Sequence, residues 1–432
     1  MLDLHLMATR SRSAAWTLAA SSLEERNATL LLMAEELNAR RDLIFAANEA
    51  DMAAAEKDQL AAPLLGRLKF REEKLHAVTE GLRALATLPD PIGQTTLARE
   101  LTEGLDLYRV TCPIGVIGVI FESRPDALVQ IASLALKSGN AVLLKGGREA
   151  MRTNAALCDA LRAAAEKAGL PADFAQLMES REDVAAMLKE DTLIDLIIPR
   201  GSNAFVRYIM DNSRIPVLGH ADGICHVYVD AAADVTMAVD IAVDSKTQNV
   251  SVCNAMETLL VHRSIAPAFL PKVCAALRDK GVRLLGDEAA RAIVPMDAAT
   301  EADWRTEYLD LVLSIRVVPD LDTAIDHINR YGSHHTDCIV TADAAAARTF
   351  LTRVDSAGVY HNVSTRFADG FVYGFGAEVG IATGKIHARG PMGLEGLTTY
   401  KYKLLGSGQL MAEMKRGDRQ YTHRLLDGSC PM

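Results

Sequence analysis

The sequence has no long uninterrupted apolar stretch of the kind that crosses a membrane, and it has no long block of lysine and arginine. Near the N-terminus Leu2, Leu4 and Leu6 alternate with polar residues instead of forming the apolar core of a leader. A formal net charge of -10 argues against a nucleic acid or an anionic membrane surface as a partner. We therefore expect a cytoplasmic protein whose partners are small molecules.

Paired cysteines are also missing. The sequence holds seven cysteines, an odd number, and no two of them form a CxxC pair. This scatter indicates neither a disulfide framework nor a zinc site, so we expect reduced thiols and no metal. The cysteines are Cys112, Cys158, Cys225, Cys253, Cys274, Cys338 and Cys430.

The composition that is present suits a globular protein. With 432 residues, 49% hydrophobic and 24% charged, the chain is long enough for two or three domains with substantial cores. Residues 11–88 carry apolar side chains at helical spacing and predict helices, without chemistry of their own. Loose alternation over residues 97–110 predicts an antiparallel hairpin that leaves the main domain.

From residue 115 onward, short apolar strands alternate with helices. A strand at 115–121, a helix at 126–137 and a strand at 141–144 predict a parallel crossover. Continued alternation predicts a doubly wound α/β domain, which usually binds a dinucleotide. A second series of alternating strands and helices begins near residue 225. We expect a dinucleotide-binding domain (1–96 and 111–224), a second α/β domain (225–396), and a separate hairpin and tail (97–110 and 397–432).

Two segments at strand ends are candidates for cofactor contacts. Lys145, Gly146 and Gly147 follow the strand at 141–144, where open α/β sheets bind ligands. The pattern is not GxGxxG, so Lys145 is equally compatible with an ordinary solvated lysine. Gly201 and Ser202 follow a second strand and open a helix, whose free N–H groups favour a pyrophosphate. Ser202 also fits the role of a simple helix cap.

Cys253 is the candidate nucleophile, because it lies in a loop between a predicted helix and the strand-like run at 257–261. A thioester carbonyl stays electrophilic, and a thiolate leaves easily once that carbonyl has been reduced. A cysteine beside a nicotinamide can therefore interconvert acyl groups and aldehydes. The alternative is that Cys253 is one more small buried hydrophobe.

With Cys253, Lys145 and Gly201-Ser202 in this order across two α/β domains, the chain resembles the aldehyde dehydrogenase superfamily. The resemblance is closest to the branch that reduces an acyl phosphate of glutamate. It rests on residues 121–125 (FESRP), 143–147 (LLKGG), 199–203 (PRGSN), 252–258 (VCNAMET), 364–370 (STRFADG), 374–380 (GFGAEVG) and 387–394 (HARGPMGL).

The resemblance implies an aldehyde-dehydrogenase-like fold and roles for particular residues. Cys253 would accept the acyl group, and the hairpin and tail would form a small oligomerisation segment of a dimer or tetramer. Ser123 aligns where ordinary members have an oxyanion-binding asparagine, beside the Cys253 N–H. The implied dinucleotide contacts are Lys145, Gly146, Gly201 and Ser202, with Glu307 on the nicotinamide ribose.

Two features bear on cofactor and reaction. Arg148 stands where members that favour NAD often carry a glutamate, and an arginine there suits the 2′-phosphate of NADPH. Near Leu218, where hydrolytic members carry a water-activating glutamate, the sequence has none. The implied reaction is NADPH-dependent reduction of L-glutamyl 5-phosphate to L-glutamate 5-semialdehyde and phosphate, in proline biosynthesis, with possible transfer of the substrate from a glutamate 5-kinase.

The substrate carries a phosphate, a carboxylate and an ammonium, so its pocket needs cationic forks. Arginines in Gly/Pro/Ser-rich loops are the candidate anion clamps. The substrate-contact set is Arg124, Asn254, Ser364, Thr365, Arg366 and Arg389. Two rival functions remain at this point: a hydrolytic or CoA-acylating aldehyde dehydrogenase, and a catalytically silent dinucleotide-binding or structural protein.

Overall fold

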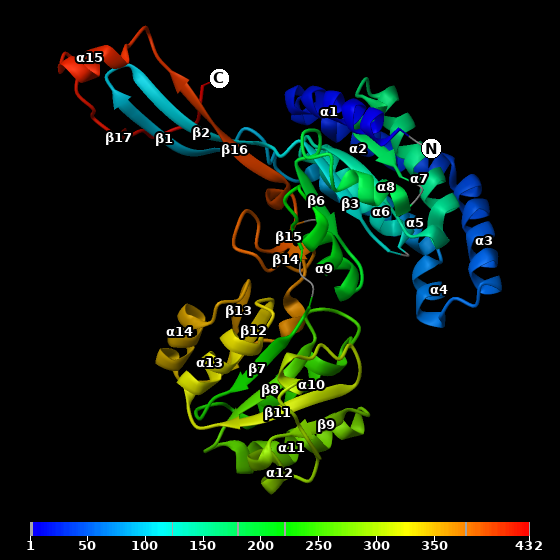
Figure 1. The fold of residues 1–432 in the computed structure, drawn as a ribbon, viewed down its shortest axis with the longest axis vertical. Helices are drawn as coiled ribbons and strands as arrows, with labels where there is room; N and C mark the ends of the chain where they lie inside the picture. Colours follow the sequence, from blue (N-terminus) through cyan, green and yellow to red (C-terminus); the bar gives the residue numbers. More distant parts are fainter. Residues whose placement is uncertain (1–2, 123, 179–180, 220–221, 376–377, 432) are drawn as a thin grey trace.

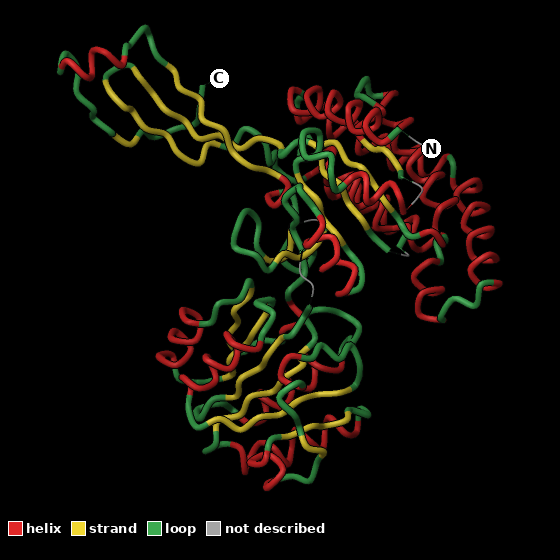
Figure 2. Tube along the Cα trace, in the orientation of Figure 1, coloured by secondary structure: helices red, strands yellow, loops and turns green. Residues whose placement is uncertain are grey.

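The computed structural model describes residues 3–122, 124–178, 181–219, 222–375 and 378–431. It contains two α/β domains and an antiparallel arm that extends away from both (Figure 1). The chain begins with a helical layer, and Figure 2 shows this layer covering the outer side of the first domain. The layer consists of α1 (Leu4–Ala20), α2 (Leu23–Ala39), α3 (Arg41–Lys57), α4 (Ala62–Leu68) and α5 (Glu72–Thr87).

The first domain is built on a parallel sheet of strand order β5-β4-β3-β6. Strands β3 and β4 are buried along their whole length, which explains their unbroken apolar sequence. Helices α6 and α7 pack on one face with α2 and α5 behind them, while α1, α8 and α9 contribute to the core on the other. The elements are β3 (Val116–Ile120), α6 (Pro125–Lys137), β4 (Ala141–Lys145), η1 (Arg148–Ala150), α7 (Met151–Lys167), η2 (Ala172–Phe174), β5 (Ala175–Leu177), α8 (Arg181–Met187), β6 (Leu196–Pro199) and α9 (Asn203–Asn212).

The second domain has a parallel sheet of order β10-β9-β11-β8-β7-β12-β13. Helices α10, α11 and α12 share one core with it, and α13 and α14 share another. Its elements are β7 (Cys225–Val229), α10 (Val235–Thr247), β8 (Met256–His262), α11 (Ala266–Asp279), β9 (Arg283–Gly286), α12 (Glu288–Ile293), β10 (Asp297–Ala298), η3 (Asp303–Arg305), β11 (Val312–Val318), α13 (Leu321–Tyr331), β12 (Thr336–Val340), α14 (Ala344–Arg353), β13 (Gly358–His361) and η4 (Thr365–Phe367).

The chain then returns to the first domain. The antiparallel pair β14 (Gly380–Ala382) and β15 (Gly390–Met392) is followed by η5 (Glu395–Leu397). Val379, Ala382 and Met392 belong to the same apolar cluster as β3 and α6. Residues 225–396 were predicted as one domain, whereas the last part of that range packs on the first domain.

The arm joins two distant parts of the chain in one antiparallel sheet of order β16-β2-β1-β17. The predicted hairpin is β1 (Thr95–Thr102) and β2 (Leu105–Pro113), slightly longer than expected. Its further strands come from the end of the chain: β16 (Thr398–Leu405) and β17 (Arg424–Leu425), with α15 (Met411–Arg416) between them. Figure 1 shows this sheet projecting away from the body of the molecule.

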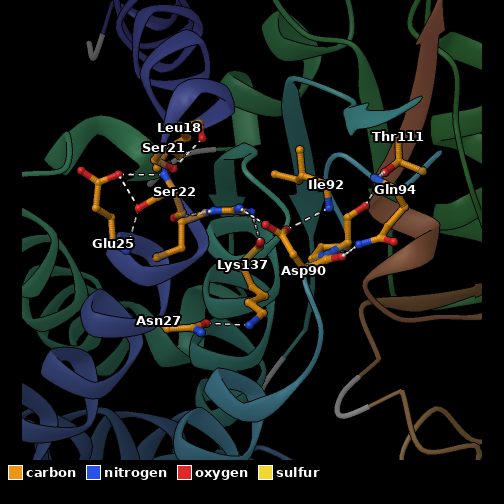
Figure 3. Close-up of polar contacts among 12 residues, drawn as sticks. Leu18, Ser21, Ser22, Glu25, Asn27, Asp90, Ile92, Gln94, Thr111 and Lys137 are labelled. Carbon is orange, nitrogen blue, oxygen red and sulfur yellow. Dashed lines mark hydrogen bonds and ion pairs between the residues drawn. The ribbon is translucent and has the colours of Figure 1, made fainter. Parts of the chain in front are cut away.

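A buried polar network holds the chain where it enters the arm (Figure 3). Arg26 is fully buried and donates to the Lys137 carbonyl and to Asp90 Oδ2, both at 2.7 Å. Lys137 Nζ in turn donates to Asn27 Oδ1 at 2.6 Å, and Asp90 Oδ1 accepts from the Ile92 N–H at 2.9 Å. Because each charge has several partners, the network fixes the direction of the chain just before β1.

Within the described ranges, no helix is long and apolar enough to span a bilayer. No group of three or more His, Cys, Asp and Glu side chains in the same ranges is arranged to hold a metal ion.

Candidate active site

A cavity of about 1240 Å³ lies between the two domains. The first domain lines it with residues that follow β3 and β6, at the carboxyl ends of parallel strands. The second domain lines it with the loop that holds Cys253, with Glu307 and with Arg366. The site therefore forms where two sheets present their carboxyl ends and loops to each other, the usual place for a ligand.

The Cys253 loop joins the end of α10 to the start of β8, and the cysteine is partly exposed to the cavity. Its backbone is tightly enclosed from behind. Cys225 Sγ donates to the Cys253 carbonyl at 3.3 Å. A Cβ at Gly223 would lie 2.3 Å from that carbonyl oxygen and 2.5 Å from the Cys253 Cα. Glycine at position 223 therefore permits a close approach of two backbone segments.

A fully buried ion pair connects the two ends of this loop. Lys246 Nζ lies 2.5 Å from Glu257 Oε2, and both side chains have no exposed surface. Burial raises the pKa of Glu257 to about 7, against the opposing effect of Lys246, and burial lowers the pKa of Lys246. Glu257 Oε1 also accepts from the Leu309 N–H at 3.2 Å, which links the loop to the segment that carries Glu307.

Asn254 lies beside the nucleophile and has an unused acceptor. Its Nδ2 donates to the Ala368 carbonyl at 2.9 Å, whereas its buried Oδ1 has no hydrogen-bond partner among the described residues. Thr365 Oγ1 donates to the Asn254 carbonyl at 2.7 Å, and Ser364 Oγ is hydrogen-bonded to Ser245 Oγ at 3.1 Å. Thr365 and Ser364 are buried and do not line the cavity. Thr365 holds the Asn254 backbone in place, and Ser364 joins its loop to α10 through Ser245.

Two of the three predicted arginine clamps line the cavity. Arg124 Nη2 lies 2.9 Å from Asp126 Oδ2, so part of its charge is already balanced. Arg366 Nε donates to Gln248 Oε1 at 2.9 Å, which fixes the plane of the guanidinium. Both side chains are therefore positioned by protein contacts before a ligand binds.

Arg389 and Ser123 complete the predicted set. Arg389 does not line the cavity: Nη1 pairs with Asp355 Oδ1 at 3.2 Å, Nη2 donates to the Asp355 carbonyl at 3.0 Å, and Nε donates to the Thr383 carbonyl at 3.3 Å. Its donors are occupied in joining two loops. Ser123 lies outside the described residues.

Three of the predicted cofactor contacts meet in a smaller pocket at the end of β4. Lys145, Gly146 and Arg148 line it together with Asn154 and residues after β5. A Cβ at Gly146 would lie 2.2 Å from Asn154 Nδ2, so glycine keeps the strand end open there. The exposed Arg148 and the buried Lys145 place two cations around this pocket.

The other three predicted cofactor contacts lie at the N-terminus of α9. Gly201 and Ser202 line the large cavity, and the Ser202 N–H donates to Glu122 Oε1 at 3.2 Å. This N–H therefore already binds an anionic group. Glu307 also lines the cavity, and Asn203 Nδ2 donates to its Oε2 at 2.7 Å across the two domains.

Sequence reasoning missed several charged residues of the cavity. Arg67 and Lys74 come from the helical layer to which no chemistry was assigned, and both line it. Arg200 lines it as well, although the sequence analysis treated it only as part of a phosphate-binding loop. Its position directly after a buried strand, like that of Lys145 after β4, was the available signal.

Comparison with known proteins agrees with this architecture. The model described as "Aldehyde dehydrogenase family" matches residues 3–311. This range is well over half of the chain, which therefore belongs to the aldehyde dehydrogenase family.

The particular branch follows from closer relatives. The chain is 57% identical to the γ-glutamyl phosphate reductase of Pelotomaculum thermopropionicum, over 99% of this chain and 98% of the relative. It is 59% identical to that of Synechococcus elongatus, over 95% of each. The crystal structure of the Thermotoga maritima γ-glutamyl phosphate reductase superposes with a TM-score of 0.93 at 40% identity, covering 94% of this chain and 99% of that one. Within the family, the chain belongs to the γ-glutamyl phosphate reductases, which are oxidoreductases of proline biosynthesis.

Proposed function

We propose that the chain reduces L-glutamyl 5-phosphate to L-glutamate 5-semialdehyde and phosphate, with NADPH, through a thioester on Cys253. The observation that supports it best is a partly exposed cysteine in a cavity between two α/β domains, with arginines on both sides. Cys253 Sγ attacks the acyl carbon, an S–C bond forms, and the C–O bond to phosphate breaks with its electron pair. The Cys253 N–H, with Ser123 or a neighbour, stabilises the carbonyl oxygen.

Bound NADPH would supply a hydride to the thioester, and collapse of the resulting thiohemiacetal on Cys253 would release the aldehyde and restore the thiolate. The proposed cofactor contacts are Lys145, Gly146, Arg148, Gly201, Ser202 and Glu307. Two cationic side chains at the end of β4 suit a ribose that carries a 2′-phosphate. The Ser202 N–H already donates to a carboxylate and so suits a pyrophosphate.

We assign the substrate's charged groups to residues of the large cavity. Arg124 and Arg366 bind its anionic groups, because both guanidinium groups line the cavity. Asn254 Oδ1 accepts from the α-ammonium, which satisfies an acceptor with no partner in the described part of the chain. Thr365 acts through Asn254, Ser364 supports the same loop through Ser245, and the contacts of Arg389 with Asp355 favour a structural role.

The rival hydrolytic reaction makes a different prediction about phosphate. Because the sequence has no glutamate near Leu218 to activate water, the thioester should wait for inorganic phosphate when the reaction runs backwards. The test mixes enzyme, NADP and glutamate 5-semialdehyde in a phosphate-free buffer, follows NADPH, and then adds phosphate. We expect at most about one equivalent of NADPH per site before phosphate and sustained turnover afterwards.

The outcome separates the two reactions. Sustained NADPH formation without phosphate, with free glutamate as the product, would mean that water reaches the thioester. The hydrolytic aldehyde dehydrogenase would then be the correct assignment. A silent dinucleotide-binding protein would give neither the initial equivalent nor the later turnover.

We also propose that the enzyme is a homo-oligomer, a dimer or tetramer, held together by the arm. Strand β16 is an edge strand of the arm sheet, and Tyr400, Tyr402 and Leu404 on it are exposed. Light scattering of the intact chain and of a Tyr402→Glu variant tests this proposal: a lower mass is expected for the variant. We propose the cytoplasm as the compartment, because it suits free thiols such as Cys158, Cys253 and Cys338.

A further inference from the structure

Two guanidinium groups from different domains face the cavity beside Cys253. Arg200 follows β6 in the first domain, and its backbone N–H donates to the Ile120 carbonyl at 2.7 Å, which anchors the residue at the end of two adjacent strands. Arg366 lies in η4 of the second domain. Both line the cavity that exposes the nucleophile.

Both side chains keep donors available. Among the described residues, the guanidinium of Arg200 makes no hydrogen bond, and its nearest anion is Glu378 Oε1, 3.9 Å from Nη2. The other oxygen of Glu378 accepts from the Gly370 N–H at 3.1 Å, so that carboxylate has a second partner. Arg366 uses Nε for Gln248, and its terminal nitrogens make no hydrogen bond within the described part of the chain.

Both guanidinium groups are partly withdrawn from water in the cavity that also exposes Cys253. Burial lowers the pKa of Arg200, while Glu378 and the Cys253 thiolate raise it and the cationic Arg124 lowers it further. Burial also lowers the pKa of Arg366, and the Cys253 thiolate is the strongest influence that raises it. A pair of partly desolvated guanidinium groups in the cavity that exposes Cys253 favours a bound anion.

We propose that Arg200, together with Arg366, forms the binding site for the phosphoryl group of the substrate and for the inorganic phosphate that leaves. This inference rests on the proposed function and adds to it, because Arg200 was associated with the cofactor pyrophosphate. The leaving group departs from the carbon that bonds to Cys253 Sγ, so its cationic partners must lie beside that sulfur. Arg124, paired with Asp126, is then left for the α-carboxylate.

The site has a consequence for the two domains. Each contributes one arginine, so a bound phosphate touches the dinucleotide-binding domain and the catalytic domain at once. In the reverse reaction, phosphate bound there lies next to the thioester carbonyl and attacks it without diffusing further.

Protection of the thiol by inorganic phosphate tests the proposal without cofactor or acyl phosphate. Iodoacetamide, which is neutral, alkylates Cys253, and mass spectrometry follows the tryptic peptide 247–263, in which Cys253 is the only cysteine. The variants are Arg200→Met and the control Arg207→Met, which removes the same charge from an exposed position on α9 outside the cavity lining. The extent of alkylation of Cys430 in the arm, measured on the tryptic peptide 425–432, is the control for differences in iodoacetamide reactivity between samples.

We expect phosphate to slow alkylation of Cys253 in the wild type and in Arg207→Met. In Arg200→Met, the phosphate concentration needed for half-protection should rise about tenfold or more, the effect of losing one charge-assisted contact. Arg200→Lys should recover only part of the protection, since an ammonium lacks the planar fork. NADPH binding should be unchanged in all variants, which also shows that they are folded.

Two results would overturn the assignment. If phosphate protects Arg200→Met as well as it protects the wild type, or if it does not protect the wild type at all, Arg200 is not part of a phosphate site. If NADPH binding is weakened while phosphate protection is intact, Arg200 binds the cofactor instead. None of these results depends on turnover, so they are distinct from a failure of the proposed function, which would appear as no NADPH oxidation with L-glutamyl 5-phosphate.

Discussion

Replacing Gly223 with alanine should displace the nucleophile. A Cβ there would lie 2.3 Å from the Cys253 carbonyl oxygen, 2.5 Å from its Cα and 2.7 Å from its carbonyl carbon, whereas ordinary van der Waals contact begins at 3.4 Å. The backbone at 253 would have to move by about 1 Å. The obstacle is backbone rather than the end of a flexible side chain, and the buried pair of Lys246 and Glu257 holds both ends of the loop, so a rotamer change cannot relieve the contact.

A displacement of that size costs on the order of 100-fold in kcat, and overpacking of this kind costs about 1–3 kcal/mol of stability. The assay is steady-state NADPH oxidation, with NADPH titration and thermal unfolding to count folded enzyme. Gly219→Ala is the matched control, because a Cβ there meets Pro199 Cγ at an ordinary 3.4 Å. If Gly223→Ala keeps kcat within about twofold of the control per folded molecule, the argument from close approach is wrong.

Four further perturbations test other parts of the site. Cys253→Ser should keep NADPH affinity in a fluorescence titration and lose several orders of magnitude in turnover, because an alkoxide is not available at neutral pH; near-normal turnover would exclude the thioester. Arg148→Glu should weaken NADPH binding at least about tenfold more than NADH binding, and equal losses would mean that Arg148 does not contact the 2′-phosphate. Lys246→Met leaves the Glu257 carboxyl buried without its partner and should destabilise by about 3–5 kcal/mol, while apolar replacement of both should destabilise much less; equal losses in chemical denaturation would contradict this. Burial lowers the pKa of His327 from 6.5 to about 2; its contribution to stability is full above pH 6.5 and falls by about 1.4 kcal/mol per pH unit below it. Chemical denaturation as a function of pH should show a flatter curve for His327→Gln, and parallel curves would refute the assignment.

The central strands could be predicted because a strand that is buried on both faces has an unbroken apolar sequence. β3, β4 and β7 are fully buried runs, and each was expected within a few residues of its position. Shorter strands in the outer part of the sheet, such as β9 and β13, were missed because four residues with mixed burial carry no clear period.

The candidate site was likewise predictable from local sequence only in part. Position at or after the end of a buried strand was enough to bring Lys145 and Ser202 to the two pockets, while Cys253 reaches the larger one from the loop between α10 and β8. The function of an individual arginine was not predictable, since it depends on which acceptor the fold places nearby. Arg389 meets Asp355, while Arg200 keeps its donors for a ligand. Those contacts join segments far apart in the chain, so they cannot be predicted from local sequence patterns.

The sheet of the arm can be completed only at the end of protein synthesis. Strands β1 and β2 leave the ribosome early, but β16, which pairs with β2 along its whole length, is among the last segments synthesised. At ordinary rates of translation this delay is on the order of tens of seconds. During that time the nascent chain exposes a two-stranded hairpin, which is marginally stable by itself, with an open edge beside Tyr108 and Val110. The buried contacts of Arg26 and Lys137 at its base are complete long before β16 appears, so they can hold the hairpin away from the body until its partner strand arrives.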